Sequence, residues 1–152
     1  ITTPMVLERV ESNAVNNTQD VKSTMFTYGT LLSSINITLS TTKYNTQDSL
    51  KIDLNQVTEA SLNYMANNGV QNILTKRDKY VTPNGAEGLK VFGTAQFPSP
   101  LSGKMRNGNY AILAFTTENI LQQILLFLDA DDDYANQIME RVLNSVELKK
   151  IE

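Results

Sequence analysis

Cysteine and histidine are both absent from the 152 residues of this sequence. Without cysteine the chain has no disulfide framework, no thiol nucleophile and no cysteine-based zinc site. Without histidine it lacks the commonest general base and the commonest ligand of transition metals. A Gly-x-Ser-x-Gly turn is also missing, and a Ser-His-Asp triad is impossible. We therefore predict a protein that is not an enzyme and that carries no cofactor.

Charge is sparse as well. Charged residues make up 19% of the sequence and the net charge is −3, with acidic and basic residues interleaved. Since no basic block is present, nucleic acid is not an expected partner. No apolar run approaches the roughly 18 residues of a membrane-spanning helix. The most apolar window, 120–128, is interrupted by Gln122 and Gln123.

The composition also suggests a compartment. The chain begins at Ile1 without a methionine and is rich in asparagine and threonine. These features suit an extracytoplasmic bacterial protein, in the periplasm or at the cell surface, whose signal peptide was removed. A lipid anchor outside the covered chain is compatible with this hypothesis.

The length fits one domain, 1–152. Apolar residues alternate with polar ones from Leu31 to Ser40, which predicts a half-buried antiparallel strand. Asp53 is a good N-cap for a helix that ends near Gly69. A second helix with an apolar stripe follows an N-cap at Asp132 or Asp133. Between the helices lie four strand candidates in hairpins. The antiparallel strands and the two separated helices predict an α+β fold.

The segment from Asp53 to Leu148 resembles PsbP/Mog1-like domains, including bacterial lipoprotein-type members of unknown function. The features that carry this resemblance are the capped helix, the hairpin sequence Gly-Ala-Glu-Gly-Leu-Lys-Val-Phe-Gly at 85–93, the strand pair within 110–128, and the last helix with its aspartate-rich start. The resemblance implies an α/β/α sandwich. It also implies a non-enzymatic role, because relatives of this kind mostly bind other proteins, and no shared active site is carried over.

The densest acidic cluster precedes the second helix. Asp129, Asp131 and Asp133 have the spacing of the first, third and fifth ligands of a calcium loop, and Glu140 stands at the twelfth position. The sixth position, however, requires glycine and holds Tyr134, where the apolar helical stripe already begins. We therefore prefer an acidic helix cap to a metal site.

Five basic residues are the candidates for a partner-binding patch. They are Lys76, Arg77, Lys79, Lys104 and Arg106. Asp78 lies among the first three and lowers the local charge. The alternative is that all five are ordinary solvated side chains.

Two functions remain open. The first is a non-enzymatic interaction domain whose partner is another protein, bound at the sheet face, at a strand edge or at the loop 98–109. The alternative is a carrier of a small molecule or lipid, with a cavity between the sheet and a helix. A tightly packed interior would contradict the second hypothesis.

Overall fold

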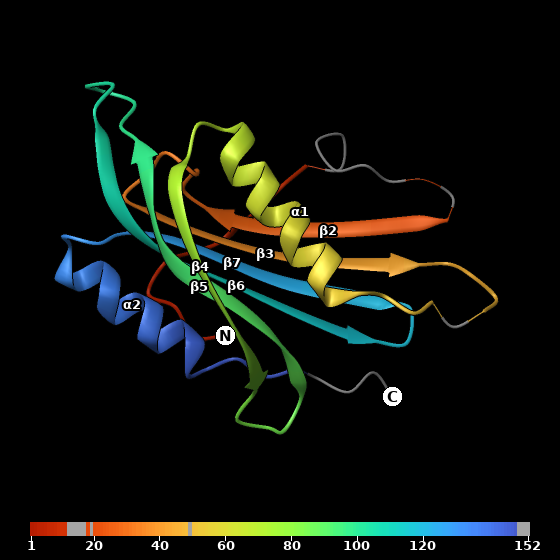
Figure 1. Ribbon diagram of the computed structural model, residues 1–152. Helices are drawn as coiled ribbons and strands as arrows, with labels where there is room; N and C mark the ends of the chain where they lie inside the picture. Colours follow the sequence, from red (N-terminus) through yellow and green to blue (C-terminus); the bar gives the residue numbers. More distant parts are fainter. Residues whose placement is uncertain (12–17, 19, 49, 149–152) are drawn as a thin grey trace.

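One seven-stranded sheet forms the centre of the structure, a computed structural model that describes residues 1–11, 18, 20–48 and 50–148 (Figure 1). The strand order is β1-β2-β3-β7-β6-β5-β4, and every neighbouring pair is antiparallel. The strands are β1 (Glu8–Arg9), β2 (Val21–Tyr28), β3 (Ile35–Tyr44), β4 (Gln71–Val81), β5 (Glu87–Pro98), β6 (Met105–Thr117) and β7 (Ile120–Asp129). The strand predicted around Leu31–Ser40 is confirmed as β3, although Leu31 precedes it.

Two helices interrupt the strands, and both begin where the sequence predicts. Helix α1 (Leu54–Asn67) has Asp53 as its N-cap, and the carboxylate accepts a hydrogen bond from the backbone N–H of Asn55. Helix α2 (Asp133–Leu143) has Asp132 as its N-cap. Gly69 follows α1 with a φ of 88°, a left-handed conformation that glycine adopts without strain.

The predicted helix-sandwiched sheet is wrong, because the fold is dominated by strands. Of the described residues, 47% are in strands and 18% in helices. The two helices lie on opposite faces, but α1 packs on β5 and β6 and α2 packs on β7. A helix about 10–12 Å wide covers only about two strands spaced roughly 4.8 Å apart. One short helix on each side therefore leaves much of both faces open.

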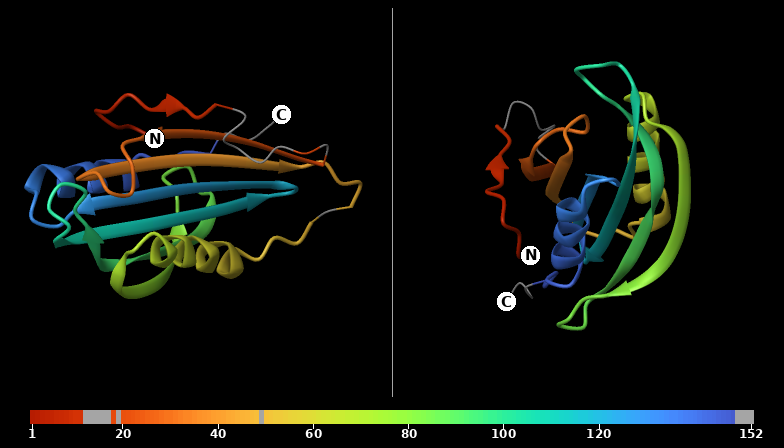
Figure 2. Two further views of the ribbon diagram at one scale, coloured as in Figure 1. Left: turned by 90° about the horizontal axis from the view of Figure 1, so that it is seen from above. Right: turned by 90° about the vertical axis from the view of Figure 1, so that its left-hand side faces the viewer.

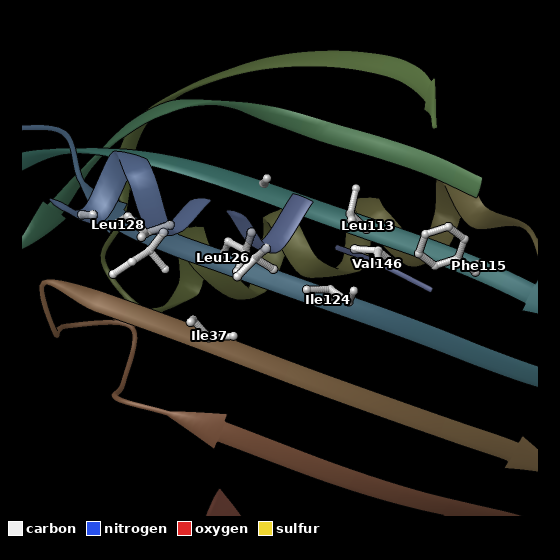
Figure 3. Packing of buried hydrophobic residues seen from close by; sticks show 11 residues of the cluster. Ile37, Leu113, Phe115, Ile124, Leu126, Leu128 and Val146 are labelled. Carbon is white, nitrogen blue, oxygen red and sulfur yellow. The ribbon is translucent and has the colours of Figure 1, made fainter. Parts of the chain in front are cut away.

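Alternating residues of the central strands pack into two separate hydrophobic cores, one on each face of the sheet. On the α2 face, Leu113 and Phe115 of β6 and Leu126 of β7 pack against α2 and Val146 (Figure 3). On the α1 face, Tyr110 and Ile112 of β6 and Phe127 of β7 join residues of α1 in a second cluster that also contains Leu31, Leu62, Met65, Val70, Val91, Ala95 and Phe97. Strands β6 and β7 are therefore buried on both faces, which explains their nearly continuous apolar sequences.

The hairpins differ from expectation in one respect. The predicted loop 98–109 is shorter than expected, because β6 starts at Met105 and pairs with β5 as far as Pro98. The side chains of 105–109 alternate within a strand, although the two prolines, two glycines and two basic residues of 98–109 are typical of a loop. No helix in the described part of the chain has the length and apolar character needed to cross a membrane.

Candidate functional site

The structure does not bring the five predicted basic residues together. Lys76 points to the α2 face of β4, whereas Arg77 and Lys79 point to the α1 face, because successive strand residues alternate. Arg77 Nη2 lies 2.6 Å from Glu59 Oε2 of α1, and Lys79 Nζ lies 2.7 Å from Glu87 Oε1 of β5. Both are thus partnered within the chain.

Arg106 holds the turn after β2. Its Nη2 donates hydrogen bonds to the backbone oxygens of Leu32 at 2.7 Å and Ser33 at 2.5 Å. Its Nη1 lies 3.5 Å from Asp129 Oδ2. Lys104 is exposed at the end of the loop 99–104. Arg106 therefore fixes a loop, and the patch is not formed as predicted.

The aspartates before α2 form a helix cap. Asp132 Oδ1 accepts hydrogen bonds from the backbone N–H of Tyr134 at 2.9 Å and of Ala135 at 3.2 Å. Asp129 Oδ1 accepts one from the N–H of Asp131 at 3.1 Å. Asp133 is the first residue of α2. Within the described ranges no three acidic side chains are grouped so that they could hold a metal ion, so Asp129, Asp131 and Asp133 do not form a calcium loop.

A groove of about 600 Å³ lies between α1 and the part of the sheet that α1 leaves open. We call it the α1 groove. Its volume falls within the roughly 300–1,000 Å³ of small-molecule pockets. The helix contributes Val57, Ala60, Ser61 and Tyr64. The sheet and the turn after β2 contribute Met25, Thr27, Gly29, Thr30, Leu31, Asn36, Thr38, Ser40, Leu121, Gln123, Leu125 and Phe127.

The α1 groove combines an apolar part with a row of uncharged polar groups. Thr27 and Thr38 share a hydrogen bond of 3.1 Å across β2 and β3. Gln123 Nε2 donates to Ser61 Oγ at 3.3 Å, which links β7 to α1. Asn36 is buried and donates to the backbone oxygen of Tyr28 at 3.1 Å. Among the residues that the structure describes, no charged side chain lines this groove.

A second groove, of about 570 Å³, lies on the other face between α2 and strands β4 to β6. We call it the α2 groove. Seen end-on, β4 and β5 bow outward away from α2 (Figure 2). The lining differs from that of the α1 groove because it includes two lysines. Its residues are Leu74, Thr75, Lys76, Lys90, Phe92, Gly93, Thr94, Asn109, Tyr110, Ala111, Met139 and Leu143.

Gly93 of β5 lies in the floor of the α2 groove. It pairs with Thr75 of β4, next to an irregularity in that strand. The register shifts between Gln71 and Leu74, and a Cβ on Gly93 would lie 1.8 Å from the backbone oxygen of Leu74. The irregularity thus lies in β4 and not in β5, the strand that contains Gly93. A side chain at this position would displace β4, so glycine is required here.

Two tyrosines have altered titration. Burial raises the pKa of Tyr80, whose hydroxyl donates to the backbone oxygen of Leu143. Burial also raises the pKa of Tyr110, partly opposed by its hydrogen bond with Thr75 and by the charge of Arg77. Both hydroxyls tie one element to another. Both pKa values are raised, in the direction opposite to that of an activated nucleophile.

The sequence analysis gave a cavity between the sheet and a helix as an alternative, but it identified the lining residues of neither groove. The polar residues that alternate in β3 correctly predicted a strand, but Asn36 is 4% exposed and belongs to a groove wall and not to a solvated face. One sequence feature could have indicated the α1 groove. The polar positions Thr38 and Ser40 carry small hydroxyl side chains, where a solvated strand face often carries charged ones. No family model matches the chain, and no curated protein matches its sequence.

Proposed function

We propose that this chain is a non-enzymatic binding domain that holds an uncharged, largely apolar small molecule or lipid in the α1 groove. One observation supports this most directly: a groove of about 600 Å³ between helix and sheet has no charged residue in the described part of its lining. Such a site disfavours ions, since an ion loses hydration there without gaining a partner. It favours an apolar body that carries hydroxyl or carbonyl groups.

The lining explains how such a ligand would be oriented. Val57 and Tyr64 of α1 and Leu125 of β7 offer apolar contacts, while Thr38 and Ser40 offer hydroxyls on β3. A hydroxyl both donates and accepts, and it rotates to suit its partner. The apolar side of the ligand would face α1 and β7, and its polar groups would face β3.

Substituting Ala60 tests this proposal. Ala60 is exposed on α1 and lines the groove, so Ala60→Trp fills the site without altering the core. Ala66→Trp is the matched control, because Ala66 is exposed on the same helix and does not line the groove. Binding of the uncharged fluorophore Nile red is measured by titration.

We expect saturable binding that Ala60→Trp weakens at least tenfold, or about 1.4 kcal/mol, and that Ala66→Trp leaves unchanged. Denaturant unfolding of both variants verifies that they are folded. Equal binding by wild type and Ala60→Trp, or no saturable binding at all, would overturn the proposal. Native mass spectrometry of protein purified without detergent then identifies any ligand that is carried along.

The other expectations stay predictions. They are the resemblance to PsbP/Mog1-like domains, the extracytoplasmic location, a lipid anchor outside the chain and a protein partner. For a protein partner, the most exposed large apolar side chain among the described residues is that of Leu101, which is 98% exposed on the loop 99–104. The strand edge offers less, because β4 carries charged residues along it, and such residues discourage pairing with another strand.

A further inference from the structure

We propose that the α2 groove is a second binding site and that its ligand is a long-chain carboxylate. The inference is independent of the α1 groove, because the two grooves lie on opposite faces of the sheet and share no lining residue. It depends on the combination of two lysines with an apolar recess.

The two lysines stand on either side of one aromatic ring. Lys76 of β4 lies directly opposite Phe92 of β5, and Lys90 lies two residues before Phe92 on the same face. Lys90 Nζ lies 4.5 Å from the centroid of the Phe92 ring. A cation–π contact of this kind holds the ammonium group over the groove. Both lysines are thus neighbours of Phe92 on one face of the sheet, and both line the groove.

Lys79, Arg77 and Arg106 each have a carboxylate within salt-bridge distance. Among the described residues, the ammonium groups of Lys76 and Lys90 have none. The nearest acidic group on this face is Asp78, which lies opposite Lys90 in the strand register. From α2, exposed Glu140 follows Met139 in the sequence. Neither lines the groove, so the lining itself has two positive charges and no negative one.

The remaining lining is suited to an alkyl chain. Leu74 of β4 is 68% exposed, and Met139 and Leu143 of α2 face it across the groove. Methionine adapts its shape to irregular apolar partners. Exposed apolar surface in a recess is covered favourably by an alkyl chain. The charge complementarity then fixes the orientation, with the carboxylate at Lys76 and Lys90 and the chain toward Met139.

The experiment compares dodecanoate with 1-dodecanol, which has the same chain without the charge. Binding is followed by isothermal titration calorimetry below the micellar concentration. We expect dodecanoate to bind at least tenfold more tightly than 1-dodecanol and its affinity to fall with added salt. The double variant Lys76→Gln/Lys90→Gln should remove this tenfold preference. Lys79→Gln, on the same strand but the opposite face, is the control and should retain it.

A groove-filling variant separates charge from shape. Thr94 is exposed and lines the groove, so Thr94→Trp should abolish dodecanoate binding and leave Nile red binding in the α1 groove unchanged. Equal affinities for dodecanoate and 1-dodecanol, or an unchanged preference in the double lysine variant, would overturn the proposal. So would binding to phosphatidylglycerol vesicles that depends on both lysines without any binding of free dodecanoate, since the site would then recognise a membrane surface.

Discussion

Replacing Arg106 by methionine removes the guanidinium group that holds the turn after β2 while it keeps an unbranched side chain of similar length. The guanidinium donates to the backbone oxygens of Leu32 and Ser33 and lies beside Asp129. The side chains of Arg106 and Asp129 are only 20% and 23% exposed, so water screens their charges weakly. We therefore expect Arg106→Met to destabilise the protein.

The size of the loss follows from these contacts. A hydrogen bond to a charged group contributes about 1.5–3 kcal/mol, and two of them are lost. Two features reduce this sum. Leu32 and Ser33 are partly exposed, so water replaces some of the bonding. Arg106 Nε is buried without a hydrogen-bond partner among the described groups, and the substitution removes that cost. We expect a loss of about 2–4 kcal/mol in the free energy of unfolding.

The assay is urea unfolding at neutral pH, followed by circular dichroism. Lys104→Met is the matched control, because Lys104 is exposed two residues away and should change the stability by less than about 0.5 kcal/mol. A loss for Arg106→Met as small as that of the control would refute the reasoning. Since Leu31 and Thr30 of the same turn line the α1 groove, Nile red binding should also weaken in Arg106→Met.

Two further predictions concern the cap and the tyrosines. Asp132→Ala removes the N-cap of α2 and should lower the free energy of unfolding by about 1 kcal/mol, measured with urea. Asp131→Ala is the control and should change it little. Equal losses for the two variants would contradict a specific contribution from the cap. Burial raises the pKa of Tyr80 and Tyr110 in the folded state. The unfolded chain then loses these protons first as the pH rises above about 10, so their contribution to stability is full below that pH and is lost above it. Between about pH 9 and about pH 11 the free energy of unfolding should fall more in the wild type than in Tyr80→Phe/Tyr110→Phe, and an equal fall would contradict the pKa direction.

Local signals in the sequence predicted the helices and strands better than the way in which they pack together. The caps at Asp53 and Asp132 were predictable, because capping depends on a few adjacent residues. The extent of β6 was underestimated, because Gly108 and Asn109 look like loop residues in isolation. In the sheet, Gly108 is needed beside Phe97: a Cβ there would lie 2.4 Å from the Phe97 ring. Only the pairing of β5 with β6 reveals that requirement.

The candidate sites were harder to predict, for a related reason. Neighbours in a strand face opposite sides, so Lys76 and Arg77 are adjacent in sequence and separated by the sheet in space. Lys76 instead shares a groove with Lys90, which comes from the next strand. No spacing rule identifies such a pair before the strand register is known. The helix cap at Asp132 was predictable because it does not depend on how the strands pair.

The charged residues of β4 also have a consequence for the behaviour of the protein at high concentration. This strand is 11 residues long and lies at the end of the sheet order, where one side has no neighbouring strand among the described residues. Its exposed centre, Lys76 to Lys79, carries three positive charges and one negative charge. Two molecules that approached edge to edge here would bring two segments of net positive charge together. We therefore expect the same residues that suggested a docking surface to disfavour fibril-like association.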